Sequence, residues 1–256
     1  MSTSPATAGA EPFCNSRNFG KKARTTYNRR NGPDMLPQTE APHSEALETM
    51  PPATGSRAKG LRDKQGDFII VLMRVRYTEI GVCGLSCRLC PRYHTETKSK
   101  CFGCKSESRM AVGCPFITCA IKHKGVEFCW DCDEYSRCEK WAKRRTFGRR
   151  HDSFKCYQRL EEDIAFIQKH RVVAFEKQQK ARETILTEML REFNEGRSKS
   201  FYCIAATVMT VDELQEAIAR ARAESQGLPI TAKSKVFHAL LDAIGKRRKY
   251  CLKLRG

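Results

Sequence analysis

The sequence predicts an α+β protein in which a small cysteine-rich, metal-stabilised module precedes helices and a small two-stranded β-α-α-β unit. Three observations predict this fold class. Ten of the fourteen cysteines lie between residues 83 and 138. Residues 153–194 carry apolar side chains at helical spacing. Two short apolar stretches, 201–209 and 250–254, have the composition or alternation of strands and flank two helical patterns.

The composition divides the 256 residues into four parts. Residues 1–66 are rich in small and charged residues without an apolar period, which predicts a disordered leader. A cysteine-rich metal-binding module over 67–145, a helical linker over 146–198 and a small α/β unit over 199–256 follow. The apolar run from Phe68 to Met73 predicts a buried strand. Met73 is also a candidate natural start, since it stands ten residues before the first cysteine of the module.

The cysteine segment has the spacing of a metal centre. Three of its gaps are C-x2-C, a pattern that places two thiolates on one tight turn. Two such pairs supply the four sulfurs that a tetrahedral zinc ion or an iron–sulfur cluster needs. The candidate ligands are Cys83, Cys87, Cys90, Cys101, Cys104, Cys114, Cys119, Cys129, Cys132 and Cys138.

Spacing alone leaves the partition of these ligands open. One zinc site is expected from Cys87/Cys90 and Cys101/Cys104, since the ten residues between the pairs are close to ribbon and knuckle spacings. A second site would take Cys114, Cys119, Cys129 and Cys132. Cys83 and Cys138 would then share a third ion with His94 or His123, serve as alternate ligands, or be buried thiols. Nested pairings fit the spacing equally well.

An iron–sulfur cluster is the main alternative to Zn²⁺. Cys83-x3-Cys87-x2-Cys90 has the spacing of radical S-adenosylmethionine enzymes, but the sequence after it lacks the strand–helix alternation of their barrel. A [4Fe-4S] redox or sensor centre held by these three cysteines and a distant fourth stays open. No phosphate loop, nucleophile–His–Asp set or H-E-x-x-H helix is present in the sequence, so no catalytic motif predicts an enzyme.

Helical patterns dominate from residue 153 to residue 194. Leu160, Ile164 and Ile167 form one stripe, and a second stripe runs from Ile185 to Phe193. The polar stretch 176–184 between them predicts either two helices or one long helix with a solvated middle.

The C-terminal unit is predicted as strand, helix, helix, strand. Residues 201–209 are apolar and partly β-branched, and residues 250–254 alternate. Between these strands, Thr210 to Glu213 is a capping box that opens a helix, which Gly227 and Pro229 end. A further helix carries Val236, Phe237, Leu240, Leu241 and Ile244 on one face.

Charge and hydropathy set the expected environment. The net charge of +18 is spread along the chain, and the longest apolar run is far shorter than the roughly 18 residues of a membrane span. No secretory signal is visible, so we expect a cytoplasmic protein whose clustered cysteines bind metal. The metal is expected to be structural and the module to serve interaction with an unknown protein partner. Nucleic acid is an alternative partner through Arg144, Arg145, Arg149 and Arg150.

Four motifs resemble, in order, a prokaryotic family called domain of unknown function 3795. They are residues 83–93 (CGLSCRLCPRY), 101–104 (CFGC), 114–120 (CPFITCA) and 124–132 (KGVEFCWDC). The resemblance covers roughly residues 77–145. The family usually closes with an aromatic–proline–cysteine step, whereas here five residues without proline separate Cys132 from Cys138. The resemblance implies a cysteine-rich, metal-binding bacterial or archaeal protein and no known reaction.

Overall fold

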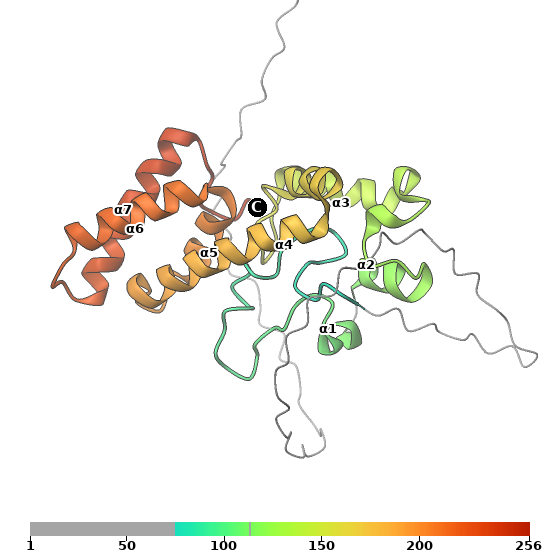
Figure 1. The fold of residues 1–256 in the computed structure, drawn as a ribbon, viewed down its shortest axis with the longest axis horizontal. Helices are drawn as coiled ribbons and strands as arrows, with labels where there is room; N and C mark the ends of the chain where they lie inside the picture. Colours follow the sequence, from blue (N-terminus) through green and yellow to red (C-terminus); the bar gives the residue numbers. More distant parts are fainter. Residues whose placement is uncertain (1–74, 113) are drawn as a thin grey trace, which may run out of the picture. The chain divides into compact units, whose positions relative to one another are not determined.

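The described residues are 75–112 and 114–256 of a computed structural model, and they form helices without a sheet (Figure 1). The predicted α+β class is therefore wrong. Within this part of the chain the sole β feature is an isolated antiparallel bridge between Ile80 and Ser86. The predicted leader over 1–66, the strand at Phe68 to Met73 and the proposed start at Met73 lie outside the described residues.

The cysteine segment consists of turns and short helices. In chain order these are α1 (Glu107–Val112), α2 (Pro115–Ile117), a π-helical turn (Thr118–His123) and two 3₁₀ turns (Cys129–Asp131 and Tyr135–Arg137). The longer helix α3 (Glu139–Arg150) follows. Such short elements have small cores, which agrees with a segment that relies on more than apolar burial for stability.

Helix α4 (Leu160–Phe193) links two regions of the core. Its backbone leaves helical geometry at Arg171, with φ 70° and ψ 162°, so it consists of two helical segments that meet at a kink. The first segment places Leu160, Ile164 and Ile167 against the cysteine segment. The second places Ile185 to Phe193 against the helices that follow. The polar stretch between them is not fully solvated, because Gln179 and Arg182 are buried.

Both predicted C-terminal strands are wrong. Residues 201–209 lie almost entirely in α5 (Lys199–Val208), where side chains on most sides of the helix are buried. A helix buried all round has no polar face, so its short apolar run resembles that of a buried strand. Residues 250–254 have no regular secondary structure and form no strand pair within the part of the chain that the structure describes. Leu252 packs there so tightly on α7 that a Cβ on Gly245 would lie 2.9 Å from its Cδ1.

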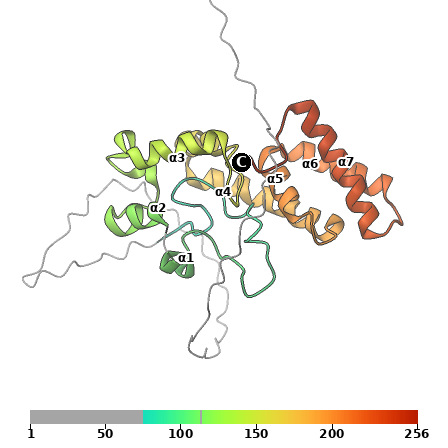
Figure 2. The same ribbon diagram turned by 180° about the vertical axis from the view of Figure 1, so that it is seen from behind.

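The two predicted C-terminal helices are confirmed. They are α6 (Val211–Glu224) and α7 (Ile230–Arg248), which lie side by side with α4 and α5 against them (Figures 1 and 2). Their shared core also includes Leu89 and Cys156, which come from outside these four helices. All described residues fall within one compact unit, and the predicted borders at 145 and 198 stay predictions. None of the described helices has the length and apolarity required to cross a membrane.

The capping box at the start of α6 is present as predicted. The Thr210 hydroxyl accepts from the Glu213 amide at 3.2 Å, and the Glu213 carboxylate accepts from the Thr210 amide at 3.0 Å. We expect Thr210→Ala to lower the free energy of unfolding by about 1 kcal/mol, measured by urea denaturation. Thr184→Ala, at an exposed position in α4, is the control and should change it by less than about 0.5 kcal/mol. Equal effects of the two substitutions would contradict a stabilising cap.

Candidate metal centre

The first C-x2-C pair is positioned by a tight turn. The Gly81 amide donates to the Leu85 carbonyl at 2.9 Å, and the Cys87 amide donates to the Glu79 carbonyl at 2.6 Å. Cys90 follows on a second turn, where its amide donates to the Cys87 carbonyl at 3.0 Å. These bonds fix the backbone that carries the Cys87 and Cys90 thiols, and both side chains are buried.

The second pair is held against the same backbone stretch. The Cys101 amide donates to the Arg92 carbonyl at 3.0 Å, and the Lys105 amide donates to the Thr78 carbonyl at 3.4 Å. Since Thr78 and Glu79 are adjacent, one short stretch anchors both turns. Thiols that are seventeen residues apart are thereby brought together: the Cys104 amide donates to the Cys87 Sγ at 3.1 Å.

The four thiols of Cys87, Cys90, Cys101 and Cys104 line one small pocket, as the spacing predicts. Arg92, Tyr93, Arg109, Phe154 and Lys155 complete its lining. Across the described residues, no three His, Cys, Asp or Glu side chains are close enough together to hold a metal ion. The backbone thus brings Cys87, Cys90, Cys101 and Cys104 around a common space. Their side chains are farther apart than those of residues that share a bound metal ion.

A buried cation contacts this pocket. Lys155 is only 6% exposed, and its Nζ lies 4.0 Å from the Cys87 Sγ. Burial lowers the pKa of Lys155, but the charges of Cys87, Cys104, Cys90 and Cys83 raise it, and the net shift is upward. A hydrogen bond from the Cys87 thiol lowers the pKa of Cys104 to about 5, and the same bond raises the pKa of Cys87. The pocket therefore favours a thiolate at Cys104 and a protonated thiol at Cys87.

The other six cysteines of the segment are gathered less tightly. Burial, followed by the charges of Cys83, Cys138, Cys119 and Cys132, raises the pKa of Cys129 to about 12. Cys83, Cys129 and Cys138 pack against the apolar cluster around Trp141. Cys114 joins Cys129 against a second cluster formed by Val82, Ile117 and Ala120. The structure thus brings Cys83 and Cys138 to the predicted second set around Cys129.

The spacing of the cysteines does not predict where the two candidate histidines and Lys155 lie. The ring Nε2 of His94 contacts the Arg88 carbonyl at 2.5 Å, and His123 is exposed. Lys155 was not a sequence candidate. It lies far along the chain from the pairs that it contacts, and no motif surrounds it that indicates burial.

Gly103, between Cys101 and Cys104, has a conformation that glycine alone adopts readily. Its φ is +113°, and a Cβ at this position would lie 2.4 Å from the Thr78 carbonyl oxygen. We expect Gly103→Ala to displace the Cys101–Cys104 turn and to cost more than about 2 kcal/mol of unfolding free energy, measured by denaturation. Gly125→Ala is the matched control. It also has a positive φ, of +63°, but no neighbour within 4 Å. It should cost about 1 kcal/mol, and an equal cost for both would contradict the predicted clash.

The fold and the site define a helical, cysteine-rich protein with a four-thiol pocket. Residues 79–143 match the family described as "Protein of unknown function (DUF3795)", so the resemblance seen in the motifs is confirmed. The matched segment runs from the turn before Cys83 into α3 and includes all ten candidate ligands. The chain matches no curated protein and no solved structure.

Proposed function

We propose that this chain is a metal-binding protein in which Cys87, Cys90, Cys101 and Cys104 hold a structural zinc ion. The observation that carries the proposal is the single pocket lined by both C-x2-C pairs. Four thiolates with no open position are the ligand set of structural zinc sites. The ligand geometry would form on binding, when the ion draws the four sulfurs together.

Charge balance around the pocket supports four thiolates. A zinc ion with four thiolates carries a formal charge of −2, which must be offset in a buried site. The Lys155 ammonium and the Cys104 amide, 4.0 Å and 3.1 Å from the Cys87 Sγ, supply positive charge and a hydrogen bond to the sulfur. Such partners beyond the ligands orient and stabilise a metal centre. Conversely, bound thiolates explain why an ammonium is buried here.

The position of Cys83 favours zinc over the iron–sulfur alternative. That alternative needs Cys83, Cys87 and Cys90 on one cluster. Cys83 does not line the pocket of the other two, and its charge acts on Cys129 as well as on Lys155 at the edge of that pocket. We propose that Cys83 belongs with Cys114, Cys119, Cys129, Cys132 and Cys138, from which a second zinc ion would take four ligands.

The metal would fix a surface for interaction. Phe102, within the second C-x2-C turn, is 62% exposed, and Phe154, which lines the thiol pocket, is 51% exposed. Exposed aromatic side chains on a rigid turn are suited to a protein partner. The basic run of α3 supports nucleic acid less well, because Arg145 pairs with Glu161 and Arg144 lies over the Tyr157 ring. A nucleic-acid partner stays a prediction.

Elemental analysis and an absorption spectrum of the full chain, purified without oxygen, test the proposal. We expect about two zinc ions per chain and no visible absorbance. Iron and sulfide, with a broad band near roughly 400 nm, would replace zinc with the iron–sulfur alternative. Protein that is folded, free of metal and unable to take up zinc from solution would refute metal binding altogether.

A further inference from the structure

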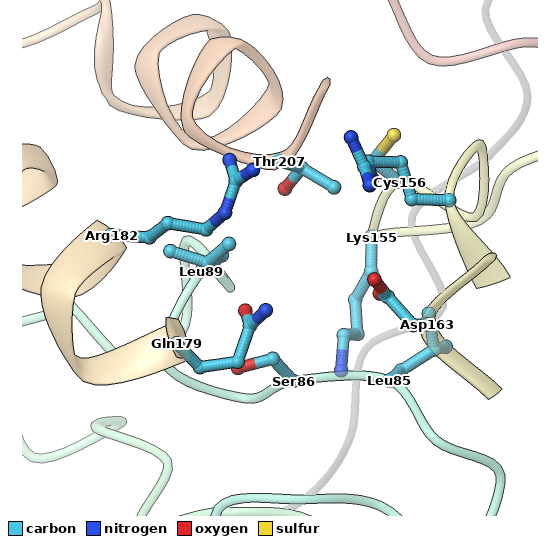
Figure 3. A pocket seen from close by; sticks show the side chains of 10 residues that line it. Leu85, Ser86, Leu89, Lys155, Cys156, Asp163, Gln179, Arg182 and Thr207 are labelled. Carbon is cyan, nitrogen blue, oxygen red and sulfur yellow. The ribbon is translucent and has the colours of Figure 1, made fainter. Parts of the chain in front are cut away.

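A polar cavity lies beside the thiol pocket and is separate from it. Figure 3 shows its side chains directed towards a common space from the first cysteine turn, the segment before α4, α4 itself and α5. Lys155 is the one residue that lines both the cavity and the thiol pocket. The cavity has about 20 Å³ of space for the centres of water-sized atoms, which admits a group of a few heavy atoms and no larger ligand.

Two buried polar atoms at this cavity have no hydrogen-bond partner. They are the Ser86 Oγ and the Gln179 Oε1, on side chains that belong to residues 8% and 3% exposed. A buried polar atom without a partner costs about 1–3 kcal/mol, so such atoms indicate a missing partner. Ser86 can donate a hydrogen bond, whereas the Gln179 carbonyl oxygen can only accept one.

The charged side chains around the cavity are mostly cationic. Lys155, Arg159 and Arg182 line it together with one carboxylate, Asp163. Arg159 is paired with Glu162 at 2.9 Å, and Lys155 faces the thiols. Arg182 is buried and donates to two carbonyls at the end of α5, those of Ala206 and Met209. Burial raises the pKa of Asp163 to about 7, although Arg159 and Arg182 lower it. Asp163 therefore offsets the Arg182 charge only in part near neutral pH.

We propose that this cavity binds a small planar oxyanion of the carboxylate type, with hydrogencarbonate as the best fit. A planar oxyanion matches the guanidinium of Arg182 and can accept from the Ser86 hydroxyl. Hydrogencarbonate also carries an O–H group, which can donate to the Gln179 Oε1. Formate offers the same acceptors without that donor, whereas phosphate is tetrahedral and one heavy atom larger than hydrogencarbonate.

Line broadening of ¹³C-labelled hydrogencarbonate and formate in solutions of the full chain tests this proposal, with thermal denaturation at constant ionic strength as the second readout. We expect hydrogencarbonate to bind about tenfold more tightly than formate, the value of one added hydrogen bond. Both should raise the unfolding temperature relative to chloride, and phosphate should not. No broadening by either anion, or equal effects of all anions, would overturn the proposal and leave water as the occupant.

Two variants locate the anion. Gln179→Leu should remove the preference for hydrogencarbonate over formate, and Ser86→Ala should weaken the binding of both. Both variants should still fold, because each removes a buried oxygen that has no hydrogen-bond partner among the described residues. Gln168→Leu, at an exposed position of α4, is the matched control and should bind like the unaltered protein. Unchanged binding by both cavity variants would place the anion elsewhere and refute the site. Because the ¹³C signal reports the anion alone, this result is independent of the zinc content.

Discussion

Cys87→Ala is expected to remove one of about two zinc ions per chain and to unfold the turns that carry the first four thiols. The Cys87 Sγ makes two polar contacts in the pocket, one with the Cys104 amide at 3.1 Å and one with the Lys155 Nζ at 4.0 Å. Structural zinc contributes about 10–16 kcal/mol in small domains, so losing a ligand should exceed the cost of any single packing change. Zinc content by elemental analysis and amide hydrogen exchange of residues 79–105 measure the effect.

Cys203→Ala is the matched control for this experiment. Cys203 is also a buried thiol, 2% exposed against 3% for Cys87, but it lies in α5 and lines a neighbouring cavity with Cys156 instead of the pocket of the four thiols. Its replacement should keep the zinc content, with a loss of stability of about 1 kcal/mol from the small cavity. If both variants keep the full zinc content, Cys87 is not a ligand and the proposed set is wrong.

Asp152→Ala is expected to have the second largest effect, a loss of about 3–5 kcal/mol in the free energy of unfolding. The Asp152 side chain is fully buried and accepts from the Tyr157 amide at 2.6 Å, the Arg255 amide at 2.8 Å and the Arg255 guanidinium at 3.0 Å. Removal of the carboxylate leaves the guanidinium without its counter-charge and two amides without acceptors. Urea denaturation measures the loss, and proteolysis near the C-terminus should become faster.

The control for Asp152 is Asp242→Ala on an exposed position of α7. It removes the same charge without a buried partner, and we expect a change below about 0.5 kcal/mol. A loss under 1 kcal/mol for Asp152→Ala would show that the contacts with Arg255 contribute little to stability. Asp152→Asn separates the loss of the charge from the loss of the hydrogen-bond acceptors, because the amide keeps one acceptor oxygen but not the charge.

The sequence predicted those elements whose local pattern and packing agree. The α6 and α7 stripes and the Thr210 cap are confirmed because each helix buries one face. The predicted strand at 201–209 was wrong because α5 is buried on most sides. A helix in such a position needs no polar face, so its sequence lacks the pattern by which a helix is recognised. The alternation at 250–254 has no counterpart in the structure, because Cys251 and Leu252 are both buried, Leu252 against α7, whereas Leu254 is exposed.

For the candidate site, spacing left the partition of the thiols open, and the structure places the four thiols of one expected set around a common pocket. The two cysteines of a C-x2-C pair lie on one tight turn, so the sequence alone predicts that their thiols are close together. Lys155 and the partners of Cys129 depend on how distant segments pack, and no short motif contains that information. Ser86 illustrates the same limit, since its unpaired hydroxyl is visible only after α4 is placed beside the first turn.

The kink at Arg171 separates two stretches of α4 whose main neighbours differ, although Phe175, just after the kink, still packs against Ile80 and Phe128 of the cysteine segment. Leu160, Ile164 and Ile167 pack with the cysteine segment, whereas Ile185 to Phe193 pack with α5 to α7. If the proposed zinc holds the cysteine turns, its removal would take away the support of Leu160, Ile164 and Ile167 first, and amide hydrogen exchange would begin at the N-terminal end of α4.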